Sequence, residues 1–151
     1  MTDGAVARNY ALVGAALLIS IVPLPRLLDL WQPPWLAVAL IWLVLAAPEN
    51  ARLAVAAAAG LLQDLLVGSP LGLYALAATV LVFLAANMRP RIVSSPPWLR
   101  FLLAMLILAA YLGVVVLIGG WFGYVGSWAG IANSLMSGGV LILIAFLFLK
   151  V

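Results

Sequence analysis

The segment from Gly60 to Gly72, which reads GLLQDLLVGSPLG, holds the densest cluster of residues in this chain that could have a specific chemical role. Asp64 is an acid within an otherwise apolar run. A carboxylate in the middle of a membrane helix costs about 2.5 to 3.5 kcal/mol on insertion scales, so such a group commonly has a partner or a function. Because Asp64 lies only three residues before Val67, it could instead reach water at the end of its helix. The residue types leave both interpretations open.

Small and polar residues repeat every four positions around this acid. The repeat consists of Arg52, Ala56, Gly60, Asp64 and Gly68. Residues four apart lie on one face of a helix, and small side chains there allow a second helix to approach closely. We expect a helix contact along this face, and a neighbour from the same chain is favoured over a foreign helix.

A second stripe of small residues lies near the C-terminus, with Asn133 and Ser137 beside it. It consists of Gly126, Gly130, Ser134 and Gly138. The pattern is typical of a helix interface but does not identify the partner. The candidate partner-binding residues of the chain are therefore Gly60, Asp64, Gly68, Gly72, Gly130, Ser134 and Gly138.

Basic residues gather in the segment MRPRIVSSPPWLR, from Met88 to Arg100. Arg89, Arg91 and Arg100 could contact a soluble partner or anionic lipid headgroups on the cytoplasmic side. The alternative is that they act only as a topology signal.

Reactive constellations are missing from the sequence. It contains no histidine and no cysteine, and its sole lysine is Lys150, so thiolate nucleophiles, imidazole bases, the commonest zinc ligands and a phosphate loop with lysine are excluded. We therefore predict no catalytic residues, no metal and no cofactor. A membrane enzyme would depend on Asp64 alone to activate water, which makes it the weakest alternative.

The composition identifies the solvent of this chain as lipid. Of 151 residues, 68% are hydrophobic and only 7% are charged, against about a quarter charged in ordinary soluble domains. The mean hydropathy is +1.31. The net charge of +3 is too small and too scattered to indicate nucleic-acid binding. We expect one integral membrane domain over residues 1–151.

Apolar runs interrupted by proline, glycine and charge predict an all-α protein with six transmembrane helices. The expected helices cover residues 10–22, 34–47, 52–67, 70–88, 98–118 and 128–149. Residues 89–97 form the predicted polar connector. Because the second and third runs are short for full spans, a re-entrant hairpin is the alternative there. A cleaved signal peptide at the N-terminus is disfavoured, because the first run leads into proline and charge.

The positive-inside rule predicts the orientation. Six basic residues fall on the side of the N-terminus, namely Arg8, Arg52, Arg89, Arg91, Arg100 and Lys150. Only Arg26 falls on the other side. This bias predicts that both termini face the cytoplasm.

The residues from Pro33 to Met88 resemble the bacterial rod shape-determining protein MreD family. A Pro-Trp-led helix ends in a Leu-Ala-x-Pro turn, and the motif Gly-x-x-x-Asp-x-x-x-Gly-Ser-x-x-Gly follows. The matching positions are Pro34, Trp35, Pro48, Gly60, Asp64, Gly68 and Gly72. Relatives often carry a basic tail, whereas this sequence stops at Lys150-Val151, so contacts of such a tail are not expected here.

The resemblance implies a non-catalytic inner-membrane scaffold of the cell-elongation machinery. It implies binding to the single-span protein MreC and, through it, a link between MreB filaments and the peptidoglycan synthases, RodA and its penicillin-binding partner. It also implies a fold similar to the S components of energy-coupling-factor vitamin transporters. An S-component-like protein would bind a small molecule, with an outward-facing pocket near Gln63, Asp64 and the aromatic segment 121–128. That function is the alternative.

Overall fold

The computed structural model describes residues 11, 13–16, 18–19, 34–48, 52–123 and 128–149 of the chain. In α6 it places side chains only for residues 131–144. Within these residues all regular structure is α-helical, which confirms the predicted all-α class. The residues described between 11 and 19 are helical, and the longer helices are α2 (Trp35–Ala46), α3 (Leu53–Val67), α4 (Leu73–Ser94), α5 (Pro97–Trp121) and α6 (Trp128–Leu149).

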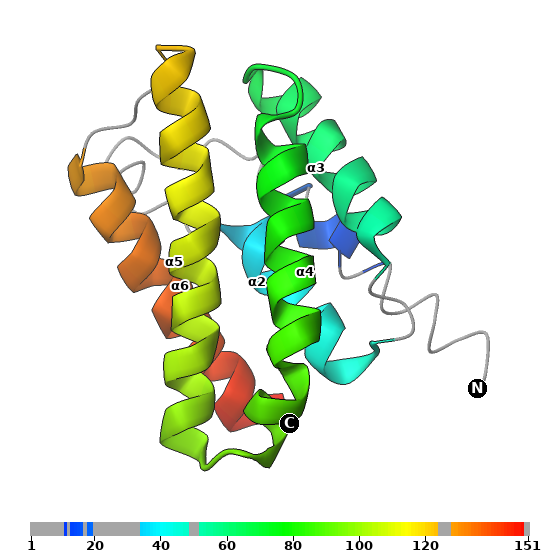
Figure 1. Ribbon diagram of the computed structural model, residues 1–151, viewed down its shortest axis with the longest axis vertical. Coiled ribbons are helices and arrows are strands. Elements are labelled where there is room, and N and C mark those ends of the chain that lie inside the picture. Colours follow the sequence, from blue (N-terminus) through cyan, green and yellow to red (C-terminus); the bar gives the residue numbers. More distant parts are fainter. Residues whose placement is uncertain are drawn as a thin grey trace.

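Helix α2 lies at the centre of the bundle. It packs against α3, α4, α5 and α6, and seven of its twelve residues are buried (Figure 1). A helix that is apolar on every side is stable only when it is enclosed by other apolar surfaces, and α2 meets that condition. At 1.5 Å per residue it is about 18 Å long, which is too short to cross a bilayer of about 30 Å on its own.

The long helices form consecutive antiparallel pairs around α2. Helix α3 packs along α4, α4 along α5, and α5 along α6 (Figure 1). The α3–α4 turn and the end of α5 lie at the top of Figure 1, and the α4–α5 connection lies at the bottom. The two ends of the bundle differ in composition. Arg89, Arg91 and Arg100 lie near the α4–α5 connection, at the lower end.

Two of the described helices, α4 and α5, are long and apolar enough to cross a membrane. Trp98, the second residue of α5, and Trp121, its last, are 64% and 93% exposed. They are separated by about 35 Å along the helix, close to the distance between the two headgroup layers. Between them α5 exposes leucines, which include Leu102, Leu106 and Leu117. This pattern supports membrane association, while the six spans remain a prediction.

The predicted connector at residues 89–97 is wrong in most of its length. Helix α4 continues through Pro90 to Ser94, and only Ser95 and Pro96 separate it from α5. Proline cannot donate a backbone hydrogen bond, and this destabilises a helix interior. The helix can nevertheless continue through a proline where tertiary contacts stabilise the following turn. The last turn of α4 is held because Ile92 is buried and Arg89 binds α2.

Helix α4 also starts later than predicted, at Leu73 rather than residue 70. Residues 68–72 instead form a turn that is stabilised by Asp64. Helix α5 extends to Trp121, three residues beyond the predicted end. The bounds of α2 and α3 lie within one residue of the predicted ones.

Candidate functional site

Asp64 forms the polar centre of the α3–α4 hairpin. Its side chain is only 1% exposed. Oδ1 accepts hydrogen bonds from the Ser69 hydroxyl at 2.8 Å and the Tyr74 backbone N–H at 2.9 Å. Oδ2 accepts from the backbone N–H groups of Gly72 at 2.8 Å and Ala75 at 3.4 Å. The carboxylate therefore has a complete set of partners within its own chain.

These donors show what the carboxylate does. The first N–H groups of a helix have no partner within the helix and carry the positive end of its dipole. Asp64 supplies two acceptor oxygens and a negative charge at the start of α4, although it belongs to α3. It acts as an N-cap that comes from the preceding helix, a role that neither sequence interpretation of this acid included.

The same residue also ends α3. Its backbone carbonyl accepts hydrogen bonds from the N–H groups of Gly68 and Ser69. Gly68 and Gly72 have φ angles of 71° and 98°, in the left-handed region that glycine adopts without steric cost. Both predicted partner-binding glycines therefore have a backbone role in a turn that directs Asp64 at α4.

Gly60 brings α3 and α4 into close contact. A Cβ atom built on this glycine would lie 2.5 Å from the Tyr74 carbonyl oxygen and 2.4 Å from the Ala75 Cα. The expected close helix contact is thus present, and the neighbour is α4 of the same chain. Gly60 and Asp64 are buried in this contact, and its partner is the same-chain neighbour that the sequence favours.

Gln63, the residue before Asp64, is a polar residue whose side-chain oxygen has no hydrogen-bond donor in the described chain. The residue is 9% exposed, and this oxygen, Oε1, is buried. Tyr111 of α5 is buried as well. Helices α3 and α5 therefore both place polar side chains in the interior of the bundle.

Gly126 of the second stripe of small residues lies outside the described residues, and the described end of the stripe, at Gly138, faces the interior. A Cβ atom on Gly138 would lie 2.6 Å from Leu108 Cδ2 and 3.2 Å from Pro34 Cγ, so α6 packs closely on α5 and on the start of α2. Ser137 is buried and donates to the Asn133 carbonyl at 2.7 Å. Ser134 is half-buried, and Gly130 lies within α6 near its start. At Gly138 the contact is intramolecular, a point that the sequence pattern leaves open.

The three arginines near the α4–α5 connection have different roles. Arg89 Nε donates to the Val44 carbonyl at 3.1 Å, and its Nη2 donates to Leu45 at 3.4 Å. The guanidinium thus binds the last carbonyls of α2, where positive charge is favourable.

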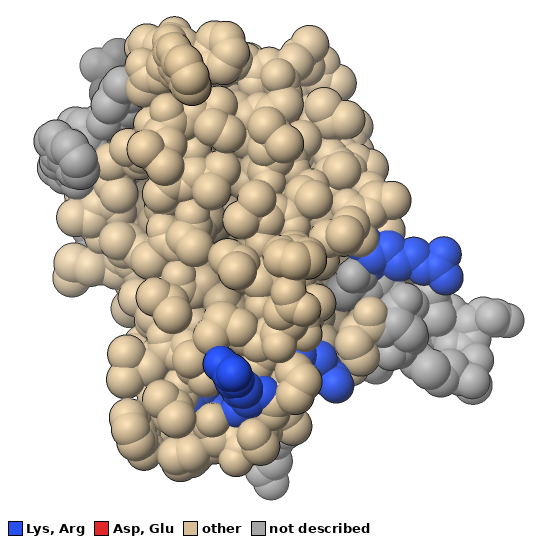
Figure 2. All heavy atoms as spheres, in the orientation of Figure 1, with Lys and Arg blue, Asp and Glu red and all other residues tan. Residues whose placement is uncertain are grey.

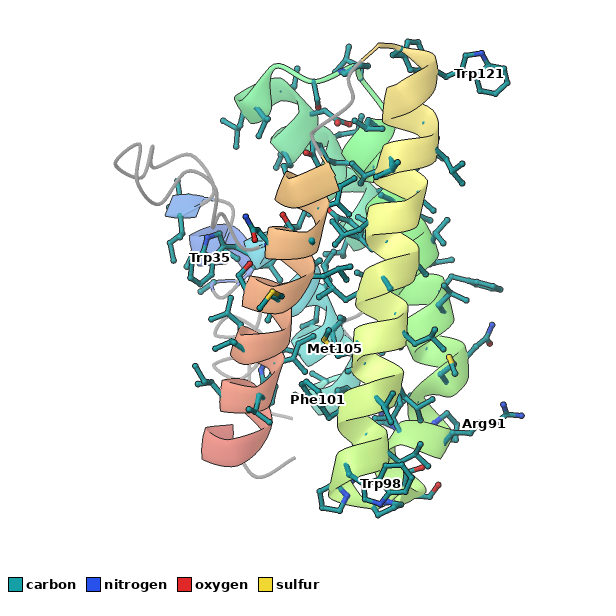
Figure 3. The ribbon with its side chains drawn as sticks, turned by 90° about the vertical axis from the view of Figure 1, so that its left-hand side faces the viewer. Trp35, Arg91, Trp98, Phe101, Met105 and Trp121 are labelled. Atoms are coloured by element: carbon teal, nitrogen blue, oxygen red, sulfur yellow. The ribbon has the colours of Figure 1, made fainter. Side chains whose placement is uncertain are left out.

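Arg100 serves the end of α4 in the same way. Its Nε donates to the Ser95 carbonyl at 2.7 Å and its Nη2 to Val93 at 2.8 Å. Arg91 is exposed. Of the three predicted cytoplasmic contacts, Arg89 and Arg100 therefore bind helix ends within the chain, and Arg91 points away from the bundle near the end marked by Trp98 (Figure 3).

Three of the described arginines, Arg89, Arg91 and Arg100, lie near the α4–α5 connection at the lower end of the molecule. Figure 2 shows basic side chains toward the lower end and along one side, with no described acid on this face. Above the basic side chain on the right, the described side chains of this face are uncharged. Arg89, Arg91 and Arg100, which the positive-inside rule places on one side of the membrane, therefore lie together at one end of the structure.

Replacing Arg89 with alanine should destabilise the fold by about 1 to 2 kcal/mol, because two carbonyls at the end of α2 lose a charged donor. Arg89→Lys should recover only part of this loss, since an ammonium group does not reproduce the two-pronged geometry of a guanidinium. Thermal unfolding in detergent measures the effect. Arg91→Ala is the matched control and should leave the melting temperature unchanged, and equal losses for both variants would contradict the assignment.

Among the described residues, no group of three or more acidic, histidine or cysteine side chains comes together in a metal-binding arrangement. The buried acid of the hairpin is saturated by donors. The described site therefore has a structural role, because its hydrogen bonds and close contacts hold neighbouring helices together.

Comparison with known proteins adds one match. The family model described as rod shape-determining protein MreD matches residues 8–151. No solved structure matches the chain significantly.

Proposed function

Since the chain belongs to the rod shape-determining protein MreD family, with its role in rod shape determination, we propose that it is a non-catalytic scaffold of the bacterial cell-elongation complex. In this proposal it is a multi-pass protein of the inner membrane. It binds an MreC-type single-span protein and supports lateral peptidoglycan synthesis. MreB filaments and the RodA and penicillin-binding synthases are its indirect partners.

The state of Asp64 is the observation that carries the non-catalytic part of the proposal. A general base or a nucleophile needs a lone pair that can reach a substrate. Asp64 is the buried acid of the described chain, and both of its oxygens already accept two hydrogen bonds each. The chain has no histidine or cysteine to replace it.

Exposed apolar faces support the membrane and partner parts of the proposal. Leu61, Leu62 and Leu65 of α3 are exposed, as are the leucines of α5. Such faces are stable against lipid tails or against another transmembrane helix. We infer that the partner helix lies against an exposed face of the bundle, because Gly60, Asp64 and Gly138 are buried within the chain.

The proposed orientation is testable because the natural sequence contains no cysteine. Ser94→Cys and Phe122→Cys place single thiols at opposite ends of the α4–α5 pair. We expect a membrane-impermeant maleimide added from the periplasmic side to label position 122 only, and to label position 94 after the inner membrane is permeabilised. The reverse pattern would contradict a cytoplasmic location of the arginines.

Affinity capture from detergent-solubilised membranes tests the partner. The tagged chain should retain a single-span MreC-type protein, whereas a multi-pass membrane protein of similar size and no role in cell shape should not. Capture of peptidoglycan synthases without any MreC-type protein would contradict the proposed order of contacts.

One observation favours the alternative, an S-component-like protein that binds a small molecule. Gln63, next to Asp64 in the sequence, has a buried Oε1 with no hydrogen-bond donor in the described part of the chain. A ligand with a hydrogen-bond donor would satisfy it. Native mass spectrometry of the purified protein should detect a retained ligand if this function is correct, and thermal stabilisation by vitamins would support it further.

A further inference from the structure

We propose that the outer face of α4 is the docking surface for the transmembrane helix of the single-span partner. This docking face consists of Phe83, Ala86, Asn87, Pro90 and Arg91. The inference rests on the proposed function and adds to it the surface, the depth and the chemistry of the contact.

The five residues form one continuous stripe. Their spacing is i, i+3, i+4, i+7 and i+8, which places them on the same side of a helix, and all five are exposed. The opposite side of α4 is buried against the bundle, with members such as Leu81, Ala85 and Ile92. Figure 3 shows Arg91 pointing outward from the ribbon, in agreement with the exposure of the stripe.

Asn87 does not suit contact with lipid tails. It lies seven residues before Ser94, or about 10 Å along the helix, while exposed Trp98 marks the headgroup level at that end. The Asn87 side chain is exposed, and its amide makes no hydrogen bond to the described part of the chain. A short polar side chain at this depth is stable when another helix supplies its donors and acceptors.

Pro90 places a second polar atom on the same face. Because proline has no N–H, the carbonyl of Ala86 lacks the donor that an ordinary residue four positions later would supply. Ala86 is small and sits between the larger Phe83 and Arg91 on the exposed stripe. An approaching helix can therefore reach both this carbonyl and the Asn87 amide, whereas a hydrocarbon tail can bond to neither.

Charge decides the identity of the occupant. Two copies of this chain packed through the same face around a two-fold axis would bring Arg91 against Arg91 at equal depth. The like charges would repel. We infer a foreign helix that carries a hydrogen-bonding side chain at the level of Asn87 and an acidic side chain about one turn nearer the Trp98 end, opposite Arg91.

Site-specific photo-crosslinking in intact membranes tests the surface. Phe83→p-benzoylphenylalanine places the probe on the docking face, and Leu106→p-benzoylphenylalanine places it on the exposed face of α5 as a matched control. We expect an adduct with the single-span partner from position 83 and not from position 106.

The other outcomes separate the surface from the function. A partner adduct from position 106 alone would overturn the docking face and leave the proposed function intact. An adduct between two copies of this chain from position 83 would overturn the foreign occupant. Absence of partner adducts from both positions, together with absence of the partner from affinity capture, would overturn the proposed function as well.

A substitution gives an independent measurement. Asn87→Leu should reduce the amount of partner captured by about 3- to 10-fold, the loss expected for an interhelical hydrogen bond. Asn87→Gln should restore part of it. The thermal stability of the isolated chain should not fall, because Asn87 is exposed and makes no side-chain hydrogen bond within the described chain. Leu106→Ala is the control with unchanged capture, and unchanged capture by Asn87→Leu would overturn the role of the amide.

Discussion

Asp64→Asn is expected to lower the free energy of unfolding by roughly 2 to 4 kcal/mol, the loss of at least two charge-assisted hydrogen bonds in a buried site. Asparagine keeps the shape of aspartate but replaces one oxygen with an NH2 group. Each oxygen of Asp64 accepts two hydrogen bonds, so either orientation of the amide directs a donor at two existing donors. The negative charge at the start of α4 is lost as well.

Thermal unfolding of the purified protein in detergent, followed by tryptophan fluorescence, measures this effect. Leu65→Ala is the matched control, because Leu65 is the next residue of α3 and is 67% exposed. It should melt within a degree or two of the wild type. If Asp64→Asn were as stable as the control, the hydrogen bonds to α4 would not contribute to the fold, and a functional role of the acid would have to be considered again.

Gly60→Ala is expected to destabilise the protein by about 1 to 3 kcal/mol, the usual cost of overpacking. The added methyl group would lie 2.6 Å or less from three backbone atoms of Tyr74 and Ala75, which cannot rotate away. Helix α3 would have to move outward from α4. That movement would also lengthen the hydrogen bonds of Asp64, which sits one turn further along α3, so the effect should fall in the upper part of this range.

Two other glycines provide controls for Gly60→Ala. No heavy atom lies within 4 Å of a Cβ built on Gly113, so Gly113→Ala should stabilise α5 by up to about 1 kcal/mol through helix propensity. Gly138→Ala should have an intermediate effect, because its closest contact is the flexible end of the Leu108 side chain. Equal melting temperatures for the three variants, measured as above, would contradict the close contact between α3 and α4.

The predictions for Asp64→Asn and Gly60→Ala concern the stability of the fold, whereas the prediction for the docking face concerns binding of the partner. Variants at Asp64 and Gly60 should lose partner capture only in proportion to the loss of folded protein. Asn87→Leu should lose capture while the chain stays folded. Measuring melting temperature and capture together therefore distinguishes residues that build the bundle from residues that recruit the partner.

Properties that depend on composition and local periodicity could be predicted from the sequence. A chain with 7% charged residues cannot cover itself in water, and apolar runs with a helical period predict an all-α fold. The Gly60 and Gly138 stripes were recognised as close-packing surfaces, since small residues four apart are visible in one dimension. The family could be identified from the motif that ends at Gly72, and the match over residues 8–151 confirms it.

Only the tertiary structure decided which groups these residues contact. Asp64 binds residues five to eleven positions later, because two left-handed glycines turn the chain back along α3. Arg89 binds carbonyls about 45 positions earlier, in a helix that hydropathy alone cannot place beside α4. Pro90 lies inside a helix because packing outweighs its local preference. Hydropathy and spacing describe one helix at a time, whereas the partner of a polar group is set by the neighbour that packing brings alongside it.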